Sequence, residues 1–483
     1  MVKKKRLKRA QRRLLTTCKR SELIKYLQNE IQSSSIHGLP YIVDHKINWI
    51  ERIFWIVSFV CSLIIIYTLI SSQFARFINS PTVMSVEMDY LEWNISYPAL
   101  TLCPLIKANF TSFNKLVDNL YNETGMYLEK YVWAVSIAAE YNLDALALTD
   151  PNNTNPINPA DYAKTAAQLF KQFDKQALTS NFNYSISIQS AMTEMGMCHV
   201  INSNVAVFDD PKKWNNEIVT YIKKNVELSV FDADFYTEII NDDALSYVFI
   251  HSPDETILST SPSYTVDKDG FITYGFQIWS TKVSKELRAT SIHVRKCRFL
   301  DEPISTRYPV YSYNNCLLEC RIQLILKLCG CVPHFYKRTG HERTCKISEL
   351  KCFLQYRREI MGLSVSNDTQ NKFTTKGKLP KSSKDCKCLS NCETDIYRKD
   401  SEDLMPDSSA NRLRIIISFP KIRIVRDIIF SFSDIFLRCG GVINTCIGSS
   451  VISLMELIMV FIRIPIFFFT KIFFDLINEI RFN

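Results

Sequence analysis

Two long apolar stretches stand apart from the mixed pattern of the rest of the chain. Residues 53–75 carry no charge, and the first 18 of them are almost all apolar. A helix of that length spans about 27 Å, close to the hydrocarbon thickness of a bilayer. Near the other end, 24 residues separate Arg438 from Arg463, and only Glu456 among them is charged. The pattern predicts two membrane spans, over 53–75 and 433–463.

The region between the spans, residues 76–432, mixes helical and strand periodicity. Apolar residues recur at three- and four-residue spacing over 129–148 and 160–173, which predicts helices. Alternation predicts strands, and strand-like or turn-like segments, over 97–104, 206–210, 247–255, 270–280, 310–315, 412–419 and 421–430. The spans are expected to join this α+β region through the strands at Tyr97–Cys103 and Arg412–Phe430.

Charge sets the expected orientation. Residues 1–52 hold 13 Lys and Arg against 4 Asp and Glu, a net charge of +9, which equals that of the whole chain. A basic tail directly before a span is the positive-inside pattern, so both termini are predicted to be cytoplasmic and no nucleic-acid partner is expected. A cleaved signal peptide is the competing interpretation, but the first stretch begins far from the N-terminus and is too long.

The sequons support an extracellular location for the middle region. Asn-x-Ser/Thr triplets, which accept glycans in secreted segments, occur only between the two spans. The predicted glycosylation sites are Asn94, Asn109, Asn122, Asn152, Asn183 and Asn367.

Cysteines are concentrated in the same region. Twelve of the 16 lie between the spans, and ten of those fall within 297–392. Cys316 and Cys320 are four residues apart and would share one side of a helix, so that two bridges could leave it in parallel. Clustered thiols also bind zinc, but thiols outside the cell oxidise, which favours disulfides.

The second stretch has polar residues that a lipid-facing helix does not need. On a continuous helix, Thr445, Ser449, Ser453 and Glu456 fall within one narrow arc, opposite an apolar face. Ser and Thr can instead bond back to the helix or pack between helices. A carboxylate inside the membrane is costly, so Glu456 favours a face that meets water, a partner or an ion path.

No enzyme motif is present. The sequence contains no nucleophile elbow, P-loop, zincin or dinucleotide-binding pattern, and its seven histidines are scattered. No catalytic residue, cofactor or resident metal is expected, and the chain is predicted not to be an enzyme.

Several motifs, in one order along the whole chain, resemble the degenerin and epithelial sodium channel family, most closely its insect pickpocket branch. In the second span, Gly440, Gly441, Gly448, Ser450, Ser453 and Glu456 match the family pattern in register. The segment SSSIHGLPYI resembles the family's His-Gly motif, and YPALTLCP the motif after the first span. The segments EMGMCHVINS, RKCRFLDE, CLLEC, CGCVPHFY and CKCLSNC resemble its cysteine motifs.

The resemblance implies a trimeric membrane channel whose disulfide-rich extracellular domain has palm, thumb and finger parts. The implied segments are an N-terminal tail (1–52), a first span (53–75), an extracellular domain (76–432) with a cysteine-rich thumb (297–392), a pore-lining span (433–463) and a C-terminal tail (464–483). It also implies the pairs Cys103–Cys198, Cys297–Cys392, Cys316–Cys388, Cys320–Cys386, Cys329–Cys352 and Cys331–Cys345.

The resemblance also assigns roles to residues of the spans. It implies a break in the second helix, where the extended backbone of Gly448, Ser449 and Ser450 forms the selectivity filter. Thr445, Ser453 and Glu456 are expected to line the pore. His37 and Gly38 are expected to fold back below the filter and affect gating. Leu437 and Arg438 differ from the usual residues before the double glycine and are also expected to affect gating.

The expected function is a plasma-membrane subunit of a voltage-independent, amiloride-sensitive channel permeable to Na⁺. Its partners are membrane lipid and homologous subunits, in a homotrimer or heterotrimer, and an unidentified extracellular stimulus; a sensory role is one interpretation. The alternatives are a regulatory, non-conducting subunit and a disulfide-rich surface receptor. An ATP-gated channel shares the topology but has a different cysteine set.

Overall fold

A computed structural model describes residues 25–466 of the chain with internal gaps. The gaps are residues 45, 80–81, 145–155, 173–176, 182–183, 185, 187, 215–218, 233–234, 241–244, 268–269, 364–385, 406–411, 430–431 and 464. The polar stretch 364–385 between Cys352 and Cys386, whose composition predicts an exposed loop, therefore lies outside the described residues. So do nearly half of the N-terminal tail, most of the C-terminal tail and three of the sequons, Asn152, Asn183 and Asn367. The chain divides into two compact units, Met1–Val83 with Ile428–Asn483, and Met84–Asp427.

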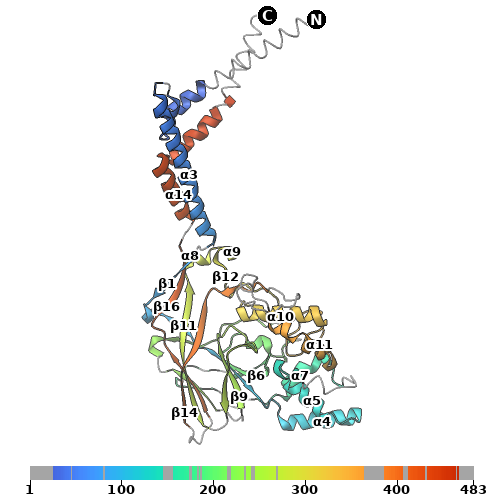
Figure 1. Ribbon diagram of the computed structural model, residues 1–483. Coiled ribbons are helices and arrows are strands. Elements are labelled where there is room, and N and C mark those ends of the chain that lie inside the picture. Colours follow the sequence, from blue (N-terminus) through green and yellow to red (C-terminus); the bar gives the residue numbers. More distant parts are fainter. Residues whose placement is uncertain are drawn as a thin grey trace, which may run out of the picture. The chain divides into compact units, whose positions relative to one another are not determined.

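The first unit consists of helices (Figure 1). Helix α3 runs over Trp49–Asn79 and is long and apolar enough to cross a membrane. Short α2, Leu39–Val43, precedes it, and α14 covers Phe432–Ile447. A further helix, Val451–Arg463, follows α14 after a bend of 78°, and these two qualify as a span only when taken together.

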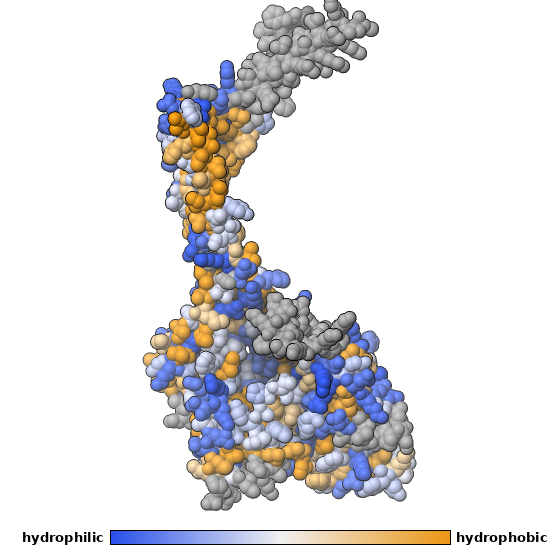
Figure 2. Space-filling model, in the orientation of Figure 1, coloured by the Kyte–Doolittle hydropathy of each residue, from blue (hydrophilic) through white to orange (hydrophobic). Residues whose placement is uncertain are grey.

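Apolar side chains cover the surface of the first unit (Figure 2). No residue of α3 is buried, and large apolar side chains along its length are exposed, including Trp49, Phe54 and Ile64. Exposed apolar surface of this extent on both candidate spans is what a lipid environment or neighbouring subunits would cover.

The second unit is built on two main sheets. The larger has the order β1–β16–β11–β15–β8–β4, and β14 also pairs with β11. Its strands are β1 Thr82–Glu87, β4 Leu178–Thr179, β8 Tyr236–Ile240, β11 Phe271–Val283, β14 Thr394–Met405, β15 Arg412–Ser418 and β16 Arg423–Ile428. The smaller has the order β10–β9–β3–β6–β5, with β3 Ala99–Pro104, β5 Ile188–Thr193, β6 Gly196–Ile201, β9 Leu245–His251 and β10 Tyr264–Asp267.

One apolar core joins the two sheets. It includes Leu100 and Val248 from the smaller sheet and Phe276 and Ile415 from the larger one. The alternation predicted over β15 is visible in its burial, because every second residue from Leu413 onward is buried and the residues between them are half-buried. Two-stranded pairs complete the strands: β2 Asn94–Ser96 with β7 Glu227–Ser229, and β12 Cys297–Arg298 with β13 Ser390–Asn391.

Helices gather beside the sheets in the second unit (Figure 1). Two short helices, α8 Lys285–Arg288 and α9 Ile292–Arg295, lie between β11 and β12 in the chain. The helices beside the sheets are α4 Phe110–Thr124, α5 Glu129–Ile137, α7 Tyr162–Leu169, α10 Tyr313–Cys329, α11 Leu350–Gln355 and α12 Arg357–Met361. A second core holds them together and includes Phe113, Val135, Ile322 and Phe353.

A buried ion pair ties α10 to the turn between β5 and β6. Arg321 Nη1 lies 2.6 Å from Glu194, and the two side chains are 3% and 0% exposed. Tyr336 donates to the same carboxylate at 2.8 Å, and the Ser259 backbone N–H donates at 2.8 Å. These bonds satisfy a charge that would otherwise be costly to bury.

Three expectations about the elements were wrong. Residues 206–209 form a 3₁₀ turn, Ala206–Asp209, rather than a strand, because the Ser203 hydroxyl accepts from the N–H groups of Val205 and Ala206. The helix predicted over 129–148 is not continuous, because α5 ends at Ile137 and a 3₁₀ turn follows at Glu140–Asn142; residues 145–148 lie outside the described residues. Residues 313–315 of the strand-like or turn-like segment begin helix α10, which Ser312 caps.

The expected link after the first span also differs. The strand that follows α3 in the chain is β1, which pairs with β16, and β16 in turn precedes α14. The segment Tyr97–Cys103 instead contributes to β3, a central strand of the smaller sheet. Short, mostly exposed β1 has too weak an alternation to be found from the sequence.

Candidate functional site

Helix α14 ends at a glycine in the left-handed conformation. Gly448 has φ of +63°, and its N–H donates to the carbonyl of Asn444 at 2.8 Å. A glycine that follows the last helical residue with positive φ is a common helix stop, because residues with a Cβ adopt this conformation at a cost. The sequence therefore stops α14 within the second apolar stretch.

The next helix begins with a reciprocal pair of serines. The Ser450 hydroxyl accepts from the Ser453 N–H at 3.3 Å, and the Ser453 hydroxyl accepts from the Ser450 N–H at 3.2 Å. The Ser450 carbonyl accepts from the Leu454 N–H at 3.1 Å. This is the arrangement of a capping box, with a second Ser in the place of the usual Glu or Gln. Ser450 and Ser453 therefore restart the helix after the bend.

His37 and Gly38 lie against this break. The His37 N–H donates to the Ile447 carbonyl at 3.0 Å. A Cβ added at Gly448 would lie 2.8 Å from the His37 ring, closer than real Cβ contacts allow. Gly38, with φ of +89°, begins α2, and a Cβ there would be 3.6 Å from Phe59 of α3. The structure thus brings the predicted filter and the predicted His-Gly gating motif into contact.

Ser35 connects the same loop to the helix Val451–Arg463, which follows the break. Its hydroxyl lies 2.8 Å from the Ser453 hydroxyl and 2.8 Å from Glu456 Oε2. The Ser35 hydroxyl is the donor toward both oxygens, so its one hydrogen is shared between the Ser453 hydroxyl and the Glu456 carboxylate. Ser453 is 4% exposed, whereas Glu456 is exposed. Sequence reasoning missed Ser35, although it stands two residues before His37 in the quoted motif.

The single polar arc predicted from a continuous helix is wrong. Thr445 lies in α14, before the break, whereas Ser453 and Glu456 lie after a bend of 78°. The Thr445 hydroxyl donates to the Gly441 carbonyl at 2.8 Å, which is the back-bonding alternative for that residue. Periodicity at 100° per residue applies only where the helix is unbroken.

Several residues of α14 before the break are exposed in one chain. Leu437 is 69% exposed, and Arg438 is exposed. A Cβ added at Gly440 or Gly441 would meet no atom of the chain within 4 Å. Nothing within one chain requires glycine at these two positions of α14.

A pocket of 570 Å³ lies beside the helix Val451–Arg463. It is lined by residues 27–39 on one side and 452–463 on the other, and Glu30, Glu456 and Arg463 are its charged residues. Arg463 Nη1 lies 3.9 Å from Glu30. The pocket extends the contact between the loop that carries His37 and the helix that carries Glu456.

The second unit holds six disulfides, in the pairing that the resemblance implies. They are Cys103–Cys198, Cys297–Cys392, Cys316–Cys388, Cys320–Cys386, Cys329–Cys352 and Cys331–Cys345. Both cysteines of the CLLEC segment leave α10 toward the segment 386–388, as their spacing predicts. Because these twelve thiols are bonded to one another, they are not available to zinc. The described sequons, Asn94, Asn109 and Asn122, are exposed.

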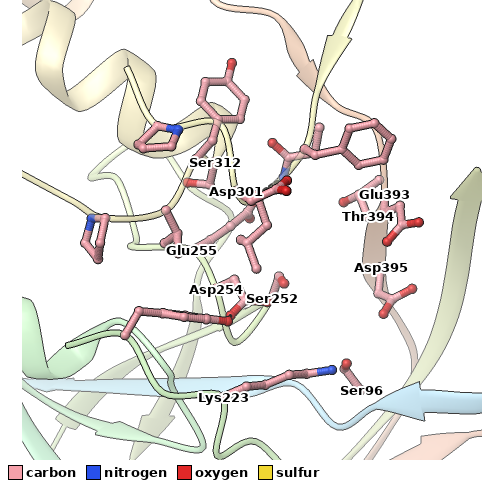
Figure 3. A pocket seen from close by; sticks show the side chains of 18 of the residues that line it. Ser96, Lys223, Ser252, Asp254, Glu255, Asp301, Ser312, Glu393, Thr394 and Asp395 are labelled. Carbon is pink, nitrogen blue, oxygen red and sulfur yellow. Dashed lines mark hydrogen bonds between the residues drawn. The ribbon is translucent and has the colours of Figure 1, made fainter. Parts of the chain in front are cut away.

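A second pocket of 570 Å³ lies in the second unit, where the segments 299–312 and 391–395 both contribute to its lining (Figure 3). Carboxylates surround it, from Asp254, Glu255, Asp301, Glu393 and Asp395. Most are paired: Tyr221 donates to Asp254 at 2.9 Å, Asn391 to Glu255 at 2.9 Å, and Arg288 to Asp301 at 3.0 Å, while Lys282 lies 3.7 Å from Asp395. Burial raises the pKa of Glu255 to about 6.

Comparisons with known proteins agree with these features. The family profile described as amiloride-sensitive sodium channel matches residues 31–460. Pickpocket protein 28 of Drosophila melanogaster is 22% identical over 92% of this chain and 79% of its own length. Sodium channel protein Nach of Drosophila ananassae is 22% identical over 89% of this chain and 85% of its own. Acid-sensing ion channel 1C of Danio rerio is 23% identical over 63% of this chain and 58% of its own.

The matched range runs from the loop that carries Ser35 and His37 to the helix that carries Glu456, and it includes all twelve bridged cysteines. The chain belongs to the amiloride-sensitive sodium channel family, whose members are ion channels of the plasma membrane.

Proposed function

We propose that the chain is a pore-forming subunit of a trimeric, voltage-independent and amiloride-sensitive sodium channel. The observation that carries the proposal is the break at Gly448–Ser450, held by the His37 loop and placed within an otherwise apolar span. A bilayer-spanning helix leaves backbone carbonyls unsatisfied only where they meet protein, water or an ion. A break of this kind therefore suits an ion path.

The filter would use the backbone of the break. Among the described residues, the carbonyls of Gly448 and Ser449 accept no hydrogen bond from a backbone N–H, whereas that of Ser450 does. Carbonyl rings from several chains can replace part of the water shell of a cation. Three copies would approach closely at the small residues Gly448, Ser449 and Ser450, so that Na⁺ meets carbonyl oxygens there.

Glu456 would provide the negative charge below the filter. Its carboxylate is exposed in one chain and accepts from Ser35, which fixes it beside Ser453. A ring of three carboxylates would attract cations and reject anions. In this arrangement the loop with Ser35, His37 and Gly38 would hold the helix Val451–Arg463 in place. Movement of this loop would then open or close the pore.

Gly440 and Gly441 would let neighbouring chains approach above the break, because no atom of their own chain occupies the space beside them. Leu437 and Arg438, exposed one turn earlier, would face the outer part of the pore or the neighbouring subunit. The residues 76–432 would be extracellular and glycosylated, with both termini in the cytoplasm and an extracellular stimulus acting on the outer unit.

The alternative is a regulatory subunit without a competent filter, which Arg438 favours. Three Arg438 side chains at the outer mouth would repel Na⁺, whereas one in a heterotrimer would be tolerated more easily. In that case the chain would conduct only together with homologous subunits.

Expression alone and with homologous subunits tests the proposal. Amiloride-sensitive Na⁺ currents are expected in at least one combination, and replacement of Ser450 by Phe should alter ion selectivity or block in that combination. A regulatory subunit would leave both properties unchanged when Ser450 is replaced. Silence with every partner, despite surface delivery, would count against channel function.

A further inference from the structure

A small cavity of 240 Å³ lies in the second unit and shares Pro309 with the carboxylate-lined pocket described above. It lies between the turn after the 3₁₀ segment Ala206–Asp209 and the chain that leads into α10. Its lining has three cationic side chains, five apolar ones and one threonine, and no described Asp or Glu. The lining residues are Val207, Phe208, Lys213, Trp214, Val219, Thr306, Arg307, Pro309 and Lys337.

Arg307 brings an incompletely bonded guanidinium to this cavity. The side chain is 1% exposed; its Nε donates to Glu319 at 2.9 Å, and its Nη2 donates to Glu342 at 2.9 Å. Its Nη1 is buried and has no hydrogen-bond partner among the described residues. An unsatisfied buried donor costs about 1–3 kcal/mol, so such a group is usually explained by a missing partner. The two carboxylates fix the orientation of the guanidinium but leave this nitrogen without a hydrogen-bond partner among the described residues.

Two ammonium groups accompany it. The Lys213 side chain has no hydrogen bond or ion pair within the described part of the chain. Lys337 Nζ lies 3.5 Å from the Arg307 carbonyl and 5.7 Å from the centre of the Phe208 ring. Burial lowers the pKa of Lys337; the nearby Asp209 acts in the opposite direction and Arg307 lowers it further. An anion in the cavity would offset both unfavourable effects on the ammonium.

The remaining lining selects against a bare inorganic ion. The Trp214 ring is fixed, because its Nε1 donates to the Phe208 carbonyl at 3.1 Å. Together with Val207, Val219 and Pro309, the two aromatic rings present apolar surface that a halide would leave in contact with water. The volume falls just below the range of about 300–1,000 Å³ that is typical of sites for drug-sized ligands, so the cavity fits a small organic molecule.

We propose that this cavity binds a small organic carboxylate with an apolar or aromatic body. The carboxylate would accept from Arg307 Nη1 and pair with both Lys213 and Lys337, while the body packs against Phe208 and Trp214. Such a ligand satisfies the unpartnered nitrogen, offsets the two ammonium charges and removes apolar surface from water at once. The site lies entirely in the second unit, so the proposal does not depend on ion conduction by the chain.

Calorimetric titration of the purified full chain with benzoate tests the proposal. Benzoate should bind saturably, whereas benzamide, its uncharged analogue, and chloride should not. Lys213→Met and Lys337→Met should each weaken benzoate binding about tenfold, as expected for the loss of one charge-assisted bond. Lys212→Met is the matched control, since Lys212 is exposed beside Lys213 but does not line the cavity, and it should leave the affinity unchanged.

Arg307 is left intact in this design, because its substitution would also strand Glu319 and Glu342. Thermal melts of the three variants should match that of the wild type, so that a loss of affinity is not a loss of folding. The proposal is overturned if benzoate does not bind, if benzamide binds equally well, if chloride alone displaces benzoate at equal concentration, or if all three lysine variants bind alike.

Discussion

Replacement of Gly448 by Ala probes the contact between the break and the His37 loop. An L-residue held at φ of +63° costs about 1–2 kcal/mol. The added Cβ would also lie 2.8 Å from the His37 ring, so the ring or the backbone must move. A cost of about 1–2 kcal/mol alone shifts an equilibrium between the docked and released loop roughly 5- to 30-fold. We therefore expect Gly448→Ala to change open probability at unchanged surface expression.

Gly125→Ala, at the C-terminal end of α4, is the matched control. Gly125 has φ of +69°, but a Cβ there meets no atom of the chain within 4 Å, so the backbone cost is kept without a clash and gating should be unchanged. The double variant Gly448→Ala with His37→Ala should recover only part of the wild-type gating, because it removes the clash but keeps the unfavourable φ. Single-channel recording measures the open probability of each variant, and surface biotinylation measures its expression at the cell surface. Wild-type gating in Gly448→Ala would refute the account of the break.

Two further predictions concern the second unit. Arg321→Met should lower its free energy of unfolding by about 3–5 kcal/mol, because Glu194 would remain buried without its partner; thermal melts of the purified chain measure this, and a change below about 1 kcal/mol would contradict it. Glu255 has a folded-state pKa of about 6 against 4.5 ordinarily, so the folded state binds this proton more tightly than the unfolded state, and this group alone contributes up to about 2 kcal/mol of stability as the pH falls from 7 to 4.5. Asp209, with a pKa also near 6, acts in the same direction, whereas burial lowers the pKa of His199, His251 and His334, which lose stability over the same range. The difference between the pH profiles of the wild type and Glu255→Gln isolates the share of Glu255; identical profiles would contradict the burial of Glu255.

The long apolar helix α3 and many of the strands could be predicted because their signals are local. An uncharged stretch such as 53–75 has few alternatives at that length, and β11 and β15 alternate clearly. The turn at Ala206–Asp209 could not be predicted from apolar alternation, because it depends on the Ser203 hydroxyl. The three apolar residues 206–208 are too short a pattern to separate a strand from a turn.

The family pattern implied a break in the second apolar stretch, and the local sequence also explains it. Gly448 followed by Ser450 and Ser453 is a helix stop and then a capping box, which periodicity alone treats as continuous helix. The contact of Ser35 with Glu456 joins residues 421 positions apart. No sequence periodicity reports such a pair, since it depends on how the loop folds back against the helix.

Thiol modification at Ser450 tests most directly whether this break lines an ion path. In a background with Cys61, Cys439 and Cys446 replaced by Ser, Ser450→Cys should make the Na⁺ current sensitive to a small, positively charged, extracellular thiol reagent. Ile452→Cys, at an exposed apolar position two residues later, is the control and should remain insensitive. Block of Ser450→Cys alone is the predicted result. An unchanged current in Ser450→Cys, or equal block at both positions, would contradict a pore at Gly448–Ser450.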